Sequence, residues 1–272
     1  MLELEHRFRA IDVHARLHPG PGRPVRAKSV DAETLQRELH QAGISQAGVF
    51  PGPVSGEQGY LRANNAVARR SVERPLTAMA RLDGPRDGTG SIRGTLVDAV
   101  ASPDPAHATP DDVKQYAYDD RFYGFKLDPE QDGLPTEPVL DALETVDLPV
   151  LLSGGRAFSP AQVDEHLLGR SFPVVLSGFG SDPGDRDAMA TAVDLLGRRD
   201  SLYLATDGVR HRDLLEAAIM EHPDRILFGS GAPTVHPNVA VMEILTLDVP
   251  QNAMERMFRK NPQRVLGGLG GE

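Results

Sequence analysis

The residues that could do chemistry stand along and just after short apolar runs. Asp12, His14 and Arg16 alternate along the first run, so their side chains can share one face of an extended strand. A histidine there can move protons near neutral pH, although a hydrogen-bonded core histidine fits the pattern equally well. The guanidinium of Arg16 can hold a carboxylate or a phosphate with two hydrogen bonds. The alternative for Arg16 is a structural ion pair with Asp12 or Asp128.

A second charged pair follows another apolar run. Lys126 and Asp128 are two residues apart, so they can share a strand face and act as an acid/base pair on a substrate. They could also form a salt bridge with each other, which is the slightly favoured interpretation. The pattern predicts a charged cluster and leaves its role open between catalysis and structure.

Two serines close later runs. Ser153 and Ser177 could each hydrogen-bond a substrate, and either could in principle be a nucleophile. Gly154 and Gly155 expose backbone N–H groups of the kind that bind anions. Neither serine lies in the Gly-x-Ser-x-Gly turn of serine hydrolases, which disfavours nucleophilic catalysis. Filling space at the end of a strand is the simpler explanation.

Further polar groups end the last two runs. Asp207 is a candidate carboxylate partner for Arg16 or His14, and Ser230 is a candidate substrate-binding residue. Three histidines lie in loops after the first, seventh and eighth runs, where histidines are commonly solvated: His18, His211 and His236. Convergence of His14, His18, Asp207 and His236 would make a metal site, which we keep as an alternative.

Eight apolar runs, usually separated by helical stretches, must position these residues. They are near-continuous rather than alternating, as is typical of parallel strands covered on both faces. The runs are 11–14, 47–50, 76–80, 124–127, 149–152, 173–176, 202–205 and 226–228. They predict an α/β fold, a single (β/α)8 TIM barrel over residues 1–272. Functional residues of such barrels lie at the carboxyl ends of the strands, so the side chains above should meet at one mouth.

Three helices can be placed from their caps or from the spacing of their apolar residues. One spans 31–43, with Asp31 as N-cap and Gly43 as its stop, and another spans 185–197. Asn261 and the proline after it predict the start of a last short helix. Residues 83–122 are too long for one connection, and we expect an excursion on the barrel there, with a lid as one option.

Composition excludes several classes of function. The chain has 272 residues, a net charge of −10 and no cysteine. The charge argues against non-specific nucleic-acid binding, and the lack of cysteine removes disulfides, thiolate metal sites and thiol nucleophiles. No apolar run approaches the roughly 20 residues that cross a bilayer, and the first residues lack the features of a signal peptide. We expect a cytoplasmic protein without membrane partners.

Several motifs in order resemble one enzyme family. They are Ile-Asp-Val-His at 11–14, Gly-Phe-Lys-Leu at 124–127, and the segments 172–176, 224–233 and 259–266. Over the whole chain the sequence is similar to the amidohydrolase-related family, which includes metal-dependent decarboxylases and lactone hydrolases of small carboxylic acids. The resemblance implies a barrel with a metal site at its mouth, and pairing into a homodimer.

The chain departs from that family at the metal ligands. The resemblance implies histidines where this chain has Arg16, Ser153 and Ser177, and an aspartate where it has Gly231. Only His14 of the expected set remains. Because a catalytic zinc site needs about three protein ligands, we predict no catalytic metal and no other cofactor.

These observations predict a metal-independent hydrolase or lyase that acts on a small anionic or carbonyl-containing metabolite. The predicted catalytic residues are His14, Asp128 and Lys126, and the predicted substrate-binding residues are Arg16, Ser153, Ser177, Asp207 and Ser230. Two alternatives stay open. The protein is a metal-dependent hydrolase with rearranged ligands, or an inactive barrel that binds a ligand or a partner protein.

Overall fold

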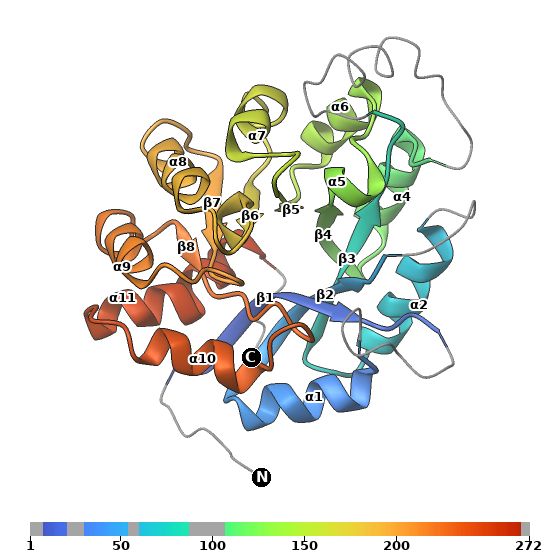
Figure 1. Ribbon diagram of the computed structural model, residues 1–272. Helices are drawn as coiled ribbons and strands as arrows, with labels where there is room; N and C mark the ends of the chain where they lie inside the picture. Colours follow the sequence, from blue (N-terminus) through green and yellow to red (C-terminus); the bar gives the residue numbers. More distant parts are fainter. Residues whose placement is uncertain (1–7, 21–29, 54–59, 87–106, 268–272) are drawn as a thin grey trace.

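Eight parallel strands form one sheet in sequence order, β1 to β8. The structure, a computed structural model, describes residues 8–20, 30–53, 60–86 and 107–267 (Figure 1). The strands are β1 (Ala10–Leu17), β2 (Ile44–Pro51), β3 (Leu76–Leu82), β4 (Phe122–Leu127), β5 (Val150–Ser153), β6 (Val174–Ser177), β7 (Leu202–Ala205) and β8 (Ile226–Leu227). Each predicted run lies in or directly beside one of them.

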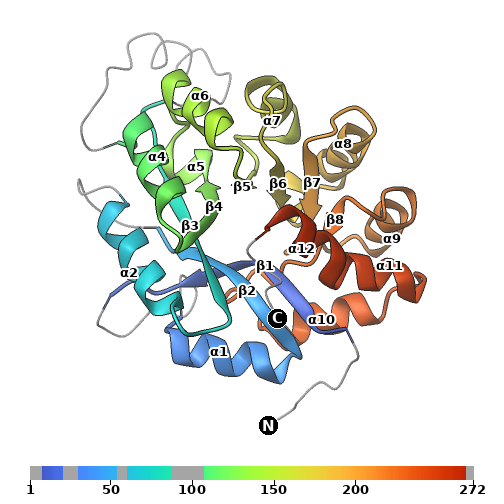
Figure 2. The same cartoon turned by 180° about the vertical axis from the view of Figure 1, so that it is seen from behind.

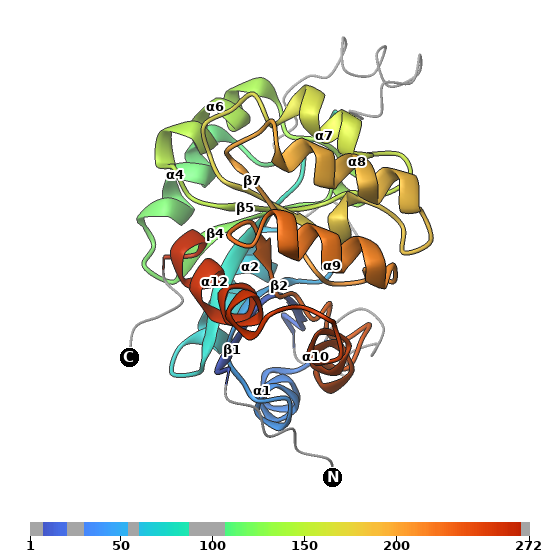
Figure 3. The same cartoon turned by 90° about the vertical axis from the view of Figure 1, so that its left-hand side faces the viewer.

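The sheet closes on itself between β1 and β8. The N–H of Val13 donates to the carbonyl of Phe228 at 2.9 Å, and the N–H of Arg16 donates to the carbonyl of Ala232 at 2.8 Å. Helices α1 and α10 touch at the same seam, so the outer ring of helices closes there too (Figure 3). The single (β/α)8 barrel is confirmed.

Helices surround the strands in Figures 1 and 2. They are α1 (Ala32–Gln41), α2 (Leu61–Ser71), α4 (Pro110–Tyr118), α5 (Pro129–Asp132), α6 (Glu137–Val146), α7 (Pro160–His166), α8 (Arg186–Leu196), α9 (Arg212–Glu221), α10 (Pro237–Leu245), α11 (Gln251–Glu255) and α12 (Asn261–Val265). A π-helical turn, Arg256–Lys260, joins α11 to α12. In the part of the chain that the structure describes, no helix has both the length and the apolar character to cross a bilayer.

Two predicted helix boundaries are confirmed. The carboxylate of Asp31 accepts the N–H of Thr34 at 2.9 Å, and Gly43 follows α1 with a φ of +68°. Asp185 caps α8 through the N–H of Ala188 at 3.1 Å. Both carboxylates satisfy N–H groups that have no partner within their own helix.

The predicted last short helix is confirmed as α12, with its proline in the first turn, but Asn261 is not its cap. Asn261 lies inside a continuous helical run, and its buried side-chain amide donates to the carbonyls of Pro223 and Ile226, both at 2.8 Å. These bonds tie the run to the amino end of β8. Val265 and Leu266 then enter the cluster inside the barrel, and Figure 2 shows α12 across one end of it.

The region 83–122 is described only in part. Residues 87–106 lie outside the described residues, so the excursion and its lid stay a prediction. Thr109 and Asp112 form a capping box at the start of α4, and α4 packs against α6 and β4. The second half of this region therefore supplies the helix that precedes β4.

Candidate functional site

The inside of the barrel changes from apolar to polar toward the carboxyl ends of the strands. Leu151 and Val175 belong to a buried inner cluster, whereas their neighbours on the strands pack outward against the helices. Ser153 and Ser177 lie two positions further along and so face inward above that cluster. Arg81 and Asp207 follow inner-cluster residues by the same step. This polar layer is the candidate site.

His14 and Asp207 meet across the β1–β8 seam. The Nδ1 atom of His14 lies 3.1 Å from Oδ2 of Asp207, and the hydroxyl of Ser177 donates to the same oxygen at 2.6 Å. Burial disfavours ionisation of Asp207, but His14, Ser177 and Lys126 outweigh it and lower its pKa below the usual value. Asp207 is therefore an anion within ion-pair distance of the imidazole, although the geometry at Nδ1 is not that of a hydrogen bond.

Glycines at the end of β8 make room for this pair. A Cβ at Gly229 would lie 2.8 Å from a carboxylate oxygen of Asp207, and one at Gly231 would lie 3.3 Å from its Cβ. Gly231 also has a φ of +69°, which favours glycine. Asp207 reaches from β7 toward the position at which the family resemblance implied an aspartate on β8.

Lys126 lies beneath the mouth and contacts Ser153. Its side chain is 1% exposed, and its Nζ donates to the hydroxyl of Ser153 and, at 3.0 Å, to the carbonyl of Leu127. The ammonium lies 5.4 Å from the centre of the Phe50 ring. Burial lowers the pKa of Lys126 to about 8, with Asp128 opposing that shift and Arg81 adding to it.

The favoured salt bridge between Lys126 and Asp128 does not form. Asp128 pairs with Arg81 instead, at 3.4 Å between Oδ2 and Nη2. Arg81 is 1% exposed, and its Nε donates to Asp132 at 2.7 Å. The hydroxyl of Tyr60 also donates to Asp132, at 2.6 Å. The sequence analysis assigned no role to Asp132 or Tyr60, because no local pattern links them to β3.

Arg16 keeps its charge without a carboxylate partner among the described residues. Its Nη2 donates to the hydroxyl of Thr234, and its buried Nε has no partner. The ion pairs considered with Asp12 and Asp128 are absent within the described ranges, although Asp128 and Asp207 are near enough to act on its charge. Burial, with Arg81 nearby, lowers the pKa of Arg16.

Asp12 does not share the mouth with His14 and Arg16. The pairing of β1 with β2 shifts register between Asp12 and Ala15, so the regular alternation fails there. The fully buried carboxylate accepts the N–H of His14 at 2.9 Å, the N–H of Ser230 at 2.8 Å and the hydroxyl of Ser230. Burial raises the pKa of Asp12 to about 6, and these hydrogen bonds oppose the shift. The hydroxyl of Ser230 is thus engaged at the seam, in place of the substrate contact suggested from the sequence.

The described side chains at the mouth form no cluster of the usual metal ligands. Over the described ranges, no three histidine, aspartate or glutamate side chains gather as a metal would require. The four-residue alternative with His18 and His236 is therefore absent there, and the ring of His236 accepts the N–H of Asn238 at 3.2 Å. His14 and Asp207 remain together, with the cations Arg16 and Lys126 near Asp207.

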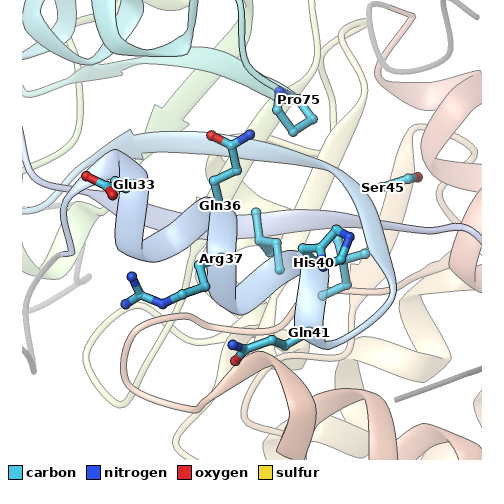
Figure 4. Close-up of a pocket in the computed structure, with 9 residues that line it drawn as sticks. Glu33, Gln36, Arg37, His40, Gln41, Ser45 and Pro75 are labelled. Carbon is cyan, nitrogen blue, oxygen red and sulfur yellow. The ribbon is translucent and has the colours of Figure 1, made fainter. Parts of the chain in front are cut away.

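A separate hollow lies outside the barrel, along α1. It has a volume of about 520 Å³ and is lined by Glu33, Gln36, Arg37, Leu39, His40, Gln41, Ile44, Ser45 and Pro75 (Figure 4). Ile44 begins β2 and Pro75 precedes β3, so this hollow lies at the amino ends of the strands. It is distinct from the mouth and shares no residue with the candidate site.

Comparison with known proteins gives the class. A sequence model described as amidohydrolase matches residues 11–268, and the chain therefore belongs to the amidohydrolase family. This confirms the resemblance seen in the sequence motifs. No curated protein sequence matches the chain.

Solved structures show the same fold at low sequence identity. An uncharacterised TIM-barrel protein of Bordetella bronchiseptica has a TM-score of 0.68 and 21% identity, covering 96% of this chain and 99% of that chain. The 2,6-dihydroxybenzoate decarboxylase of Rhizobium has a TM-score of 0.63 and 15% identity, covering 99% and 100%. The 5-carboxyvanillate decarboxylase of Sphingomonas paucimobilis has a TM-score of 0.63 and 13% identity, covering 96% and 99%.

Proposed function

We propose that the protein is a hydrolase or lyase that binds a small carboxylate-bearing metabolite at the barrel mouth and works without a catalytic metal. The observation that carries the proposal is Arg16. A half-buried guanidinium whose Nε lacks a hydrogen-bond partner has capacity for an incoming anion. Its position, two residues after His14 on β1, is the one at which the family resemblance implies a metal ligand.

Two further observations support an anionic substrate. The two decarboxylases with this fold are named for aromatic carboxylates, and the same substrate class fits an arginine-lined mouth. Lys126 adds a second cation beneath the mouth. Together the two cations would supply positive charge at the mouth, where the family resemblance implies a metal ion.

Proton transfer in this proposal belongs to His14. The carboxylate of Asp207 lies beside Nδ1 on one side of the ring, so Nε2 is the nitrogen that we assign to take a proton from the substrate or from water. Lys126 is a second proton-transfer group, because burial brings its pKa near the working range. Asp128 pairs with Arg81 and raises the pKa of Lys126, so we assign it as a positioning residue.

We also propose that the chain is one domain, forms a homodimer and works in the cytoplasm.

Binding of small carboxylates tests the proposal. Acetate, succinate, benzoate and 2,6-dihydroxybenzoate would be titrated calorimetrically into the protein and into Arg16→Ala. Loss of a charged hydrogen-bond donor should weaken the best ligand by about tenfold or more. Arg156→Ala is the matched control, because that side chain is 92% exposed and its single ion pair is at 3.9 Å. Equal affinities for the protein and Arg16→Ala would refute the proposal, whereas binding without any turnover would favour the inactive alternative.

A further inference from the structure

We infer that Ser153 is a nucleophile activated by Lys126, so that the mouth hydrolyses small esters or lactones through an acyl-enzyme. The inference deepens the proposed function, on which it rests for the carboxylate-binding part of the substrate. The sequence disfavoured a serine nucleophile because the usual turn motif is missing. The contact between the Lys126 amine and the Ser153 hydroxyl supplies the activating base by another route.

The strands place the base below and the nucleophile above. Lys126 pairs in register with Leu151, so Ser153 lies two positions further toward the mouth on the neighbouring strand. The side chain of Lys126 is 1% exposed, whereas Ser153 is partly exposed. A substrate carbonyl entering from the mouth would therefore meet the hydroxyl first, with the amine behind it.

Lys126 is also chemically suited to be a base. No carboxylate lies within ion-pair distance of it among the described residues, because Asp128 and Asp132 are held by Arg81. Burial lowers its pKa to about 8, so a useful fraction of the amine is neutral at pH 7 to 8. The charged groups that act on it from other elements are Arg81, Asp128, Asp132 and Asp207.

The turn after Ser153 is built to hold the hydroxyl in place. A Cβ at Gly154 would lie 2.5 Å from the carbonyl oxygen of Gly180, and one at Gly155 would lie 2.5 Å from the carboxylate of Glu130. Glu130 in turn accepts the N–H of Phe158 at 3.0 Å. The contact at Gly154 is with backbone, so a glycine is needed there directly after the nucleophile, whereas the Glu130 side chain beside Gly155 could move.

The reaction balances with water as the only co-reactant. The Oγ of Ser153 attacks the ester carbonyl carbon, and its proton passes to the amine of Lys126. The bond to the leaving alcohol breaks, and Lys126 returns the proton to that alkoxide. Water, deprotonated by Lys126, then attacks the acyl group, and Ser153 leaves and regains its proton.

A single introduced thiol tests the pair directly. The chain has no cysteine, so Ser153→Cys carries one thiol, whose alkylation by iodoacetamide reports its ionisation as a function of pH. An adjacent ammonium should lower the thiol pKa by about one unit and speed alkylation near pH 7 up to tenfold relative to Ser45→Cys, an exposed site on β2. Adding Lys126→Met should remove the difference, whereas Lys114→Met on exposed α4 should not. The inference would be overturned if the thiol of Ser153→Cys has an ordinary pKa that does not change when Lys126→Met is added.

Acyl trapping tests the unmodified protein and separates the two proposals. The protein would be treated with the neutral ester p-nitrophenyl acetate or with p-nitrophenyl hemisuccinate, and the acylated peptide identified by mass spectrometry. We expect the acyl group on Ser153, its loss in Ser153→Ala, and acylation slower by about 10²-fold or more in Lys126→Met. Arg16→Ala should slow acylation by the anionic ester more than acylation by the neutral one. If carboxylates bind through Arg16 but no adduct forms on Ser153, the assignment of Ser153 as a nucleophile is refuted. The proposed function would not be affected by that result.

Discussion

The pairing of His14 with Asp207 depends on the absence of a side chain at Gly229, just after β8. Asp207 comes from β7, and its carboxylate occupies space that any side chain at Gly229 would need. The position of the Asp207 carboxylate beside the imidazole thus depends on the Ser177 hydroxyl and on the missing Cβ at Gly229. A change that returns the Cβ should disturb the site without touching either polar partner.

Gly229→Ala should therefore destabilise the protein by about 1–3 kcal/mol, because the carboxylate of Asp207 must move away from its buried partners. The measurement is urea unfolding. Gly197→Ala is the control, since Gly197 has a helical φ of −72° and no neighbour nearer than 3.6 Å to an added Cβ. That variant should be neutral or slightly more stable. Equal stabilities of the two variants would contradict this account of the seam.

Asp12 should give the protein a pH dependence of unusual sign. Its pKa is about 6 when folded against 3.8 as the reference, so the folded state holds the proton more tightly. Stability from this group is present below pH 4 and falls as pH rises toward 6, by about 3 kcal/mol at most. Asp12→Asn removes that titration. As pH rises from 4 to 6, the unfolding free energy of the variant should therefore increase relative to that of the unmodified protein. Urea titrations that stay parallel over this interval would show that Asp12 does not titrate as described.

The sequence indicated the polar residues of the mouth better than their partners. Six predicted residues lie in or directly beneath the polar layer: His14, Arg16, Lys126, Ser153, Ser177 and Asp207. Their pairing depends on contacts between strands, which no local pattern encodes. Arg81 forms ion pairs with both Asp128 and Asp132, and Tyr60 donates a hydrogen bond to Asp132. Because Asp128 is paired with Arg81, Lys126 contacts Ser153 instead.

At the scale of elements, the apolar runs located all eight strands because parallel strands buried on both faces read as continuous apolar sequence. The runs missed strand ends that carry polar residues. β1 continues through Arg16 to Leu17, and β3 continues through Arg81 to Leu82. The last helix was misread at its start because an asparagine before a proline is a common cap signal. The tertiary hydrogen bonds that Asn261 makes cannot be seen from neighbouring residues.

Asn261→Ala should detach the last helical run from β8. It removes two buried hydrogen bonds and leaves the carbonyls of Pro223 and Ile226 unsatisfied, at a cost of about 2–3 kcal/mol. Asn252→Ala, at an exposed position of α11, is the matched control and should change stability little. Thermal unfolding of both variants is the measurement. A shift no larger than that of the control would mean that the run is held by apolar packing alone.

At the scale of the whole molecule, the protein retains an amidohydrolase barrel, while an arginine, two serines and a glycine stand where the family resemblance implied ligands. After preparation without a metal-binding tag, we expect less than about a tenth of an equivalent of zinc or manganese. Adding either ion should not raise the melting temperature, because only a ligand that binds the folded state does so. One equivalent of tightly held ion would restore the metal-dependent alternative.

The seam between β1 and β8 has a consequence for biosynthesis. His14 and Arg16 leave the ribosome long before their main-chain partners Gly231 and Ala232, which lie far along the sequence. The inner cluster also waits for Val265 and Leu266, which lie beyond β8. Contacts of such sequence separation form late, so the nascent chain exposes unpaired strand edges until β8 has been translated. The site at the mouth can be assembled only after Ala232 has paired with β1.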